Sequence, residues 1–234
     1  MTILTPEQLT GRVGTHVLEL SHPSCMLHPS AAAAFRALAR AAARDGIELA
    51  AASSFRSFER QLTIWNDKFA GRRPLLDRDG RALQAAALDE EGVVRAILQW
   101  SALPGASRHH WGSEIDVFDR AALGDVRSPQ LVPGEYVSGG VFERLGAFLA
   151  HHAGDYEFFL PYDRDRGGVQ PEPWHLSYAP LAVEALPALT LPVLAEALQT
   201  APLAGAATVA RLLPEIHARY VLAVGRPSLP TKPS

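Results

Sequence analysis

The sequence predicts an α+β domain, in which a few short strands lie among longer helices. Several segments repeat apolar residues with the period of a helix, and some short runs have the composition of strands. The length of 234 residues is within the range of one domain. We therefore expect residues 1–234 to form a single domain, with a core over about residues 30–180 and a helical C-terminal extension over about residues 180–225.

The first part of the chain predicts a short helix, a longer helix and a strand. Residues 6–9 read as the short helix, and the rest of the first 28 residues reads as irregular structure. Ser30 can cap a helix that runs to about Arg44. The partly alternating residues 47–53 then predict a strand.

The chain has a single cysteine, Cys25, flanked at spacings of three by His22 and His28. A metal cluster is conceivable there, but a zinc-binding cysteine normally belongs to a recognisable pair. We interpret the segment as a surface loop with one buried thiol. One cysteine also excludes an internal disulfide, which fits a reducing compartment.

The middle of the chain predicts two helices on either side of a polar loop. Ser57 can cap a helix that continues to about Ala70. Residues 88–103 show a second helical pattern, which Pro104-Gly105 ends. Residues 71–87 between them read as a loop that can border a binding cleft.

The second half of the chain predicts further strands at residues 114–118, 156–160 and 174–178. Residues 140–152 predict a helix, and residues 119–138 a loop. From Pro180 onward the pattern is helical, with breaks at prolines and a last helix over about residues 208–224. Residues 225–234 read as a loose tail.

Charge and hydropathy narrow the class of protein. The net charge of -3 and the lack of a basic, aromatic-rich run argue against nucleic acid as a partner. No apolar run is long enough for a membrane span. The first residues lack the basic start and apolar segment of a secretory leader. We therefore expect a cytoplasmic protein, with release to the periplasm or exterior as the alternative.

Two segments concentrate side chains that bind metal ions, residues 107–116 and residues 172–175. Two imidazoles and one carboxylate form a three-ligand zinc set, which leaves a fourth position open for water. A remaining carboxylate can act as general base on that water. Spacing alone leaves alternatives open, because His110 can replace His109 and Glu114 can replace Asp116.

Other chemistries fit less well. Ser107 lacks the glycine pattern of a nucleophile elbow, and the chain has no phosphate-binding glycine loop or dinucleotide fingerprint. Arg56 lies where a predicted strand meets a predicted helix, a junction from which side chains often reach a ligand. From composition alone, pairing of Arg56 with a surface carboxylate is the competing interpretation.

Taken together, these segments resemble the VanY-type D-alanyl-D-alanine carboxypeptidases of the M15 metallopeptidase family. The resemblance is carried, in family order, by Ser54-Phe55-Arg56-Ser57 with Gln61, by Ser107-x-His109-x-x-Gly112-x-x-x-Asp116 and by Glu172-x-Trp174-His175. One departure is clear: the family often has alanine two residues before the aspartate, where this chain has Glu114.

The resemblance implies a Hedgehog/D-Ala-D-Ala peptidase-like fold, with a small antiparallel sheet flanked by helices. It implies one zinc ion per chain, with His109, Asp116 and His175 as its ligands. Glu172 would be the catalytic base, and Arg56 would meet the terminal carboxylate of the substrate or the developing oxyanion. The side chains expected to contact substrate or support the site are Arg56, Gln61, Ser107 and Trp174.

The expected function is hydrolysis of the terminal D-Ala of peptidoglycan stem peptides by zinc-activated water. A peptidoglycan-derived peptide would be the partner. The same residues fit an L-Ala–D-Glu endopeptidase or a D-Ala-D-Ala dipeptidase. A zinc-bearing module that binds cell-wall peptides without turnover is an alternative of a different class, and Glu172 argues against it because binding alone needs no base.

Overall fold

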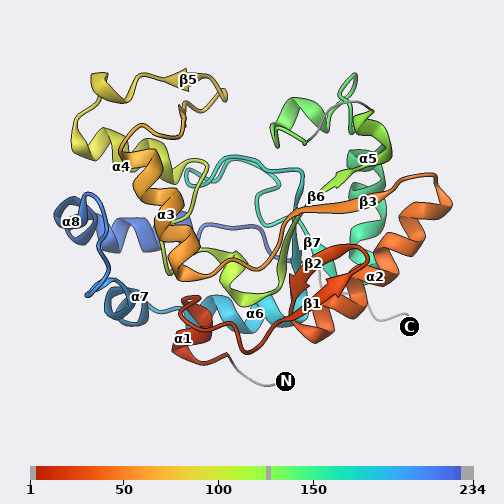
Figure 1. Cartoon of the computed structure of the whole chain (residues 1–234), viewed down its shortest axis with the longest axis horizontal. Coiled ribbons are helices and arrows are strands. Elements are labelled where there is room, and N and C mark those ends of the chain that lie inside the picture. The colour runs from red at the N-terminus through yellow and green to blue at the C-terminus, as the bar shows by residue number, and fades with distance from the viewer. Residues whose placement is uncertain (1–3, 125–127, 228–234) are drawn as a thin grey trace.

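A four-stranded antiparallel sheet forms the centre of the computed structural model, which describes residues 4–124 and 128–227. The strand order is β3 (Leu49–Ser53), β6 (Glu114–Asp119), β8 (His175–Tyr178) and β7 (Phe158–Phe159). Helices α2 (Pro29–Arg44) and α5 (Glu143–His152) lie at one end of the molecule, with the sheet between them and a second group of helices (Figure 1). The helices at the other end are α3 (Phe58–Phe69), α4 (Glu90–Leu98), α7 (Leu191–Leu198) and α8 (Ala206–Ile216). The predicted α+β class, with helices around a small antiparallel sheet, is confirmed.

The helices, in chain order, are α1 (Pro6–Leu9), α2 (Pro29–Arg44), α3 (Phe58–Phe69), α4 (Glu90–Leu98), α5 (Glu143–His152), α6 (Ala179–Ala188), α7 (Leu191–Leu198) and α8 (Ala206–Ile216). Short 3-10 turns are η1 (Ala85–Ala87), η2 (Arg108–Trp111), η3 (Ala121–Leu123), η4 (Pro133–Glu135) and η5 (Ala153–Tyr156), and a π turn, η6 (His217–Val221), extends α8.

Helix boundaries follow the predicted caps with two corrections. Ser57 caps α3 by accepting a hydrogen bond from the backbone of Arg60, as predicted. Helix α2 begins earlier than predicted, because the His28 side chain takes the capping role and accepts from the backbone N–H of Ser30. Helix α4 is shorter than the predicted 88–103 segment, since Asp89 caps it and it ends at Leu98.

The N-terminal segment predicted as irregular is instead a hairpin of β1 (Leu18–Ser21) and β2 (Ser24–Leu27). Cys25 lies on β2 with a buried thiol, so the predicted burial holds but the predicted loop does not. A second correction concerns residues 71–87, where β4 (Leu75–Leu76) and β5 (Ala82–Leu83) pair as a small hairpin. Both hairpins escaped prediction because strands this short carry little periodic signal.

The C-terminal helices pack onto the domain. Arg95 of α4 forms a bidentate ion pair with Glu215 of α8, with distances of 2.8 and 2.9 Å. The indole N–H of Trp65 on α3 donates to the Ala204 carbonyl. No single helix in the described ranges is long and apolar enough to cross a membrane; α6 and α7 pass that test only as a pair, which is bent by 78°.

Candidate metal centre and active site

The pairing of β6 with β8 brings two of the predicted ligands together. Asp116 and His175 are direct partners in this antiparallel pair. Oδ1 of Asp116 lies 3.0 Å from Nδ1 of His175, and both side chains are buried. Glu114, two residues before Asp116, is the partner of Ser177. Because side chains alternate along a strand, Glu114 and Asp116 share one face of β6.

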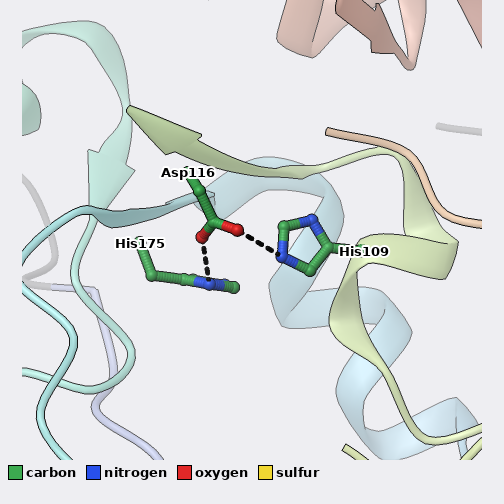
Figure 2. Close-up of side chains that lie close together, drawn as sticks. All are labelled: His109, Asp116 and His175. Carbon is green, nitrogen blue, oxygen red and sulfur yellow. Dashed lines mark ion pairs between the residues drawn. The ribbon is translucent and has the colours of Figure 1, made fainter. Parts of the chain in front are cut away.

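The third predicted ligand, His109, comes from η2, just before β6. Its Nε2 lies 3.2 Å from Oδ2 of Asp116, and its ring centroid is 4.9 Å from that of His175. Figure 2 shows both imidazoles directed at the one carboxylate. Gly112 ends η2 with a φ of 71°, and a Cβ there would lie 2.5 Å from Val17 and 2.9 Å from the backbone nitrogen of His28. Only glycine fits this turn, which sets where His109 points.

The donor set fits a metal ion. One ligand atom from each of His109, Asp116 and His175 lies within 4.8 Å of the others. Nδ1 of His109 donates to the Ser54 carbonyl at 2.8 Å, which leaves Nε2 with its lone pair facing the cluster. Oδ1 of Asp116 is buried without a hydrogen-bond donor from the described part of the chain. Two imidazole nitrogens and one carboxylate are a set that catalytic zinc sites use.

The three residues of the cluster shift one another's pKa values. Burial opposes ionisation of Asp116, but His109 and His175 outweigh it and hold its pKa well below the usual range. Burial also disfavours a charged His175, yet its close contacts with the carboxylates of Asp116, Glu114 and Glu172 raise its pKa well above the usual value. The pKa of His109 is lowered by burial. The cluster therefore holds strong electrostatic attraction for a cation.

Glu172 reaches the cluster through a tight turn. The backbone N–H of His175 donates to the Glu172 carbonyl at 3.1 Å, and the N–H of Glu172 donates to the Tyr162 carbonyl at 3.0 Å. This turn places Oε2 of Glu172 3.4 Å from Nδ1 of His175. Burial raises the pKa of Glu172, an effect that its contact with His175 partly opposes. A carboxylate with a raised pKa can both accept and return a proton near neutral pH.

A family model described as VanY, D-alanyl-D-alanine carboxypeptidase, matches residues 24–181, more than half of the chain. This chain belongs to the VanY family. It is accordingly a peptidase of the carboxypeptidase type, as the sequence motifs predicted. The VanY match runs from β2 to the first turn of α6 and includes every predicted site residue.

Relatives of this VanY chain are found among curated proteins and solved structures. An uncharacterized protein of Haemophilus influenzae is 48% identical over 103 residues, covering 43% of this chain and 70% of that protein. The structure of VanYB in complex with D-alanine-D-alanine matches with a TM-score of 0.51 and 21% identity, over 81% of this chain and 91% of that chain. A Zn(II) complex of a mutant of the vancomycin-resistance D,D-pentapeptidase VanY matches with a TM-score of 0.51 and 21% identity, over 80% of this chain and 90% of that chain. At these identities the structural likeness shows a shared fold.

A cavity of about 380 Å³ in this VanY domain opens beside the cluster. Glu172, Ser107 and Trp174 line it, together with the cationic side chains of Arg56 and Lys68. Further lining residues include Arg73, Trp100 and Tyr162. A second hollow, of about 310 Å³, lies beside α5 and touches none of these residues. Of these two hollows, the first can therefore present a ligand to the cluster.

Arg56 is held at the cavity wall by two hydrogen bonds. Its guanidinium donates to Oε1 of Gln61 at 2.7 Å and to Oγ of Ser53 at 2.8 Å. Both acceptors are neutral, and among the described residues Arg56 has no carboxylate in direct contact. The competing expectation of a surface ion pair for Arg56 is thus wrong. Burial lowers its pKa, while Asp116 and Glu172 act in the opposite sense.

Gln61, expected to contact substrate, requires a correction. Its side chain is fully buried and does not line the cavity. The amide oxygen accepts from Arg56, and the amide nitrogen donates to the Ala102 carbonyl at 2.7 Å and lies 3.4 Å from Oγ of Ser101. All of its polar atoms are therefore occupied within the protein, and Gln61 supports Arg56 from behind.

The structure also separates the alternatives that spacing left open. His110 is fully buried; its Nδ1 donates to the Arg56 carbonyl and its Nε2 accepts from Gly105, so neither nitrogen is available to a metal. Burial lowers the pKa of His110 to about 3, which keeps it neutral. Glu114 points to the far side of His175 and contacts Nε2 at 2.8 Å. Burial opposes its ionisation, but Arg108, His175 and Ser177 bring its pKa to about 2.

Ser107, which the sequence motif singled out, lines the cavity, but no hydrogen bond joins its hydroxyl to His109, Asp116 or His175. Other residues of the site carried no sequence signal. Lys68 and Tyr162 also line the cavity, and they come from α3 and from the loop after β7, outside the motif segments. The partner that orients His109 is the carbonyl of Ser54, which no side-chain pattern can reveal.

Proposed function

We propose that this protein is a zinc-dependent D-alanyl-D-alanine carboxypeptidase that removes the terminal D-Ala of peptidoglycan stem peptides. One observation carries the proposal: the Glu172 carboxylate lies beside the buried His109–Asp116–His175 cluster and lines the same cavity. Membership of the VanY family supports the reaction class. The Zn(II) complex of a protein with this fold supports the choice of metal.

His109, Asp116 and His175 are the residues that would hold the zinc ion. Zinc bound in such a set lowers the pKa of a neighbouring water and neutralises negative charge on a carbonyl oxygen. The chain contributes a dry setting for this chemistry, because all three ligands are buried. A low local dielectric strengthens each electrostatic contact in the site.

Glu172 is the group that moves the proton. Its carboxylate takes a proton from the attacking water and later returns it to the nitrogen of the departing D-Ala. The burial that raises the pKa of Glu172 helps the side chain to hold that proton between the two steps. A non-catalytic binding module has no need of such a group, which favours the enzyme.

Arg56 supplies fixed positive charge at the cavity wall. Its hydrogen bonds to Ser53 and Gln61 hold the guanidinium in place before substrate arrives. A preorganised cation stabilises negative charge that develops on the carbonyl oxygen without needing to reorient. The same position suits recognition of a substrate carboxylate.

The cavity favours a substrate with a free carboxyl end. Lys68 lines the same cavity as Arg56. Burial lowers the pKa of Lys68 and Arg73 and Arg56 lower it further, while Glu172 acts in the opposite sense. Among the described residues Lys68 has no carboxylate in hydrogen-bond contact. A partly buried ammonium is more favourable with an anion beside it, and the terminal carboxylate of a peptide is such an anion. This observation favours an exopeptidase over an endopeptidase.

Incubation of the purified protein with zinc and a pentapeptide stem ending in D-Ala–D-Ala, followed by mass spectrometry, tests the proposal. Loss of one alanine is the expected result. Loss of a D-Ala–D-Ala dipeptide indicates the dipeptidase, and internal cleavage indicates the endopeptidase. Zinc bound in full with no hydrolysis of any stem peptide indicates the binding module. The Glu172→Gln variant serves as the control for contaminating peptidases.

A further inference from the structure

Glu114 is a buried carboxylate that lies behind His175, on the side away from the cluster. Its side chain is 0% exposed. It stands on the same face of β6 as Asp116, and antiparallel pairing places it diagonal to His175 and opposite Ser177 on β8. His175 is thus held between two carboxylates of one strand: Asp116 faces Nδ1 at 3.0 Å and Glu114 faces Nε2 at 2.8 Å.

Both oxygens of Glu114 are fully engaged. Oε2 accepts from Nε2 of His175 and, at 3.3 Å, from Nε of Arg108. Oε1 accepts from the hydroxyls of Ser113 and Ser177, each at 2.7 Å, and from Nη2 of Arg108 at 3.3 Å. A buried carboxylate is stable only when a cation and hydrogen-bond donors compensate it. Arg108 and the two serines provide that compensation.

Arg108 is equally dependent on Glu114. It is buried, lies over the ring of Trp111, and Glu114 is the one carboxylate that it contacts among the described residues. Its Nη2 also donates to Oγ of Ser177 at 2.6 Å. Arg108 immediately precedes His109 in η2, and Glu114 lies on β6 beside His175. The Arg108–Glu114 ion pair therefore links the turn that carries His109 to the strand that contacts His175. The two residues therefore act as a unit.

The contact between Glu114 and Nε2 fixes which nitrogen of His175 faces the cluster. Because the Glu114 carboxylate can only accept a hydrogen bond, Nε2 carries the hydrogen and donates it to Glu114. The other nitrogen, Nδ1, then has a free lone pair and faces Asp116 and Glu172. Rotation of the His175 ring would break this hydrogen bond and deprive the buried Glu114 carboxylate of one of its donors. A carboxylate behind a metal-binding histidine fixes the tautomer and makes the ring a stronger electron donor.

We propose that Glu114, supported by Arg108, is a positioning residue that holds His175 in the orientation and tautomer of a metal ligand. The proposal rests on the proposed metal-dependent function, and it concerns metal binding before any substrate arrives. Neither Arg108 nor Glu114 is one of the three predicted ligands. We expect the pair to make this protein retain its metal more tightly than the three ligands alone would.

The test compares zinc affinity, measured by competition with a colorimetric chelator, among matched variants. Arg108→Met/Glu114→Ala removes both charges together, so that no unpaired ion is left in the interior. Glu114→Gln keeps the shape of the side chain and loses its charge. Arg95→Met/Glu215→Ala removes an ion pair between α4 and α8, away from the cluster, and is the control.

We expect the control to bind zinc as the wild type does. The Arg108→Met/Glu114→Ala variant should bind zinc about 10–100-fold more weakly, the usual effect of losing a group that orients a ligand, and Glu114→Gln by a smaller factor. Absorption bands of the Co(II)-loaded protein should shift in the same two variants, which a purely structural ion pair would not cause. Metal-free unfolding temperatures show whether each variant is folded.

Zinc affinities of both Glu114 variants within about threefold of the wild type, with unchanged Co(II) bands, would overturn the proposal. If the double variant fails to fold, the isosteric Glu114→Gln decides by the same comparison. These measurements use no peptide. A wild-type protein that hydrolyses no stem peptide would therefore defeat the proposed function while leaving the positioning role to be judged on metal binding alone.

Discussion

Asp116 on β6 and His175 on β8 are direct partners in the central sheet, and 3.0 Å separates Oδ1 of one from Nδ1 of the other. Two of the three cluster residues are therefore placed by strand register. A slip of one residue would turn one of them to the opposite face. The third, His109, depends instead on a short turn that Gly112 ends with a positive φ.

Replacing Gly112 with alanine should both destabilise the fold and weaken metal binding. A Cβ at this position meets Val17 and the backbone of His28, and the positive φ costs about 1–2 kcal/mol by itself. Gly71 has the same φ of 71° with no atom within 4 Å of its would-be Cβ, so Gly71→Ala is the matched control. Thermal unfolding and zinc titration of both variants measure the difference, and equal losses in the two would refute a special role for Gly112.

Glu172→Gln should keep its zinc and lose turnover. The side chain lies beside His175 without being one of the three clustered ligands, so metal content should stay at the wild-type level. Loss of a positioned base should reduce kcat by about 10²–10⁴-fold. Glu184→Gln, an exposed change on α6, is the control. Near wild-type turnover of Glu172→Gln on a D-Ala–D-Ala peptide would reject the assigned role.

Gln61→Leu should impair the enzyme through Arg56. The change removes the acceptor of one guanidinium hydrogen bond and the donor to the Ala102 carbonyl. Leaving buried polar groups without partners should lower the free energy of unfolding by about 1–3 kcal/mol. A raised KM should accompany the loss, because Arg56 becomes mobile. Chemical denaturation measures the loss of stability, and peptide kinetics measure KM. The exposed change Gln84→Leu is the reference variant. An unchanged KM would place Arg56 outside substrate binding.

Lys68→Met should weaken binding of peptides that end in a free carboxylate. A hydrogen bond to a charged group contributes about 1.5–3 kcal/mol, so KM should rise roughly tenfold or more. The C-terminal amide of the same peptide should be affected little, because it lacks the charge. Arg72→Met removes an exposed cation outside the cavity and is the comparison. If KM rises equally for acid and amide, Lys68 does not recognise the terminal carboxylate.

The chemistry-bearing residues were predictable because their types and spacing are unusual. His109, Asp116, Glu172 and His175 were singled out from the sequence, and the structure brings them together. The strands at 47–53, 114–118 and 174–178 were also foreseeable, since each is a short run in which apolar residues alternate or predominate, bounded by polar or turn residues. These are features that local pattern determines.

The roles of Gln61 and Glu114 could not be predicted from the sequence, because they depend on tertiary contacts. Gln61 reads as a polar helix residue, and only the packing of α3 shows that it faces inward toward Arg56. Glu114 and Asp116 lie two residues apart and so share one face of the strand, and the alternation of side chains cannot show which of them is the ligand. The register of β6 against β8 separates them, by setting Asp116 opposite His175 and Glu114 opposite Ser177.

Diffraction from zinc-soaked crystals, recorded at the zinc absorption edge, tests the central claim most directly. We predict one anomalous peak per chain, about 2.0–2.2 Å from Nε2 of His109, an oxygen of Asp116 and Nδ1 of His175. In a crystal of Asp116→Asn the peak should be weak or missing. A strong zinc peak held by other residues, with these three side chains uncoordinated, would contradict the account.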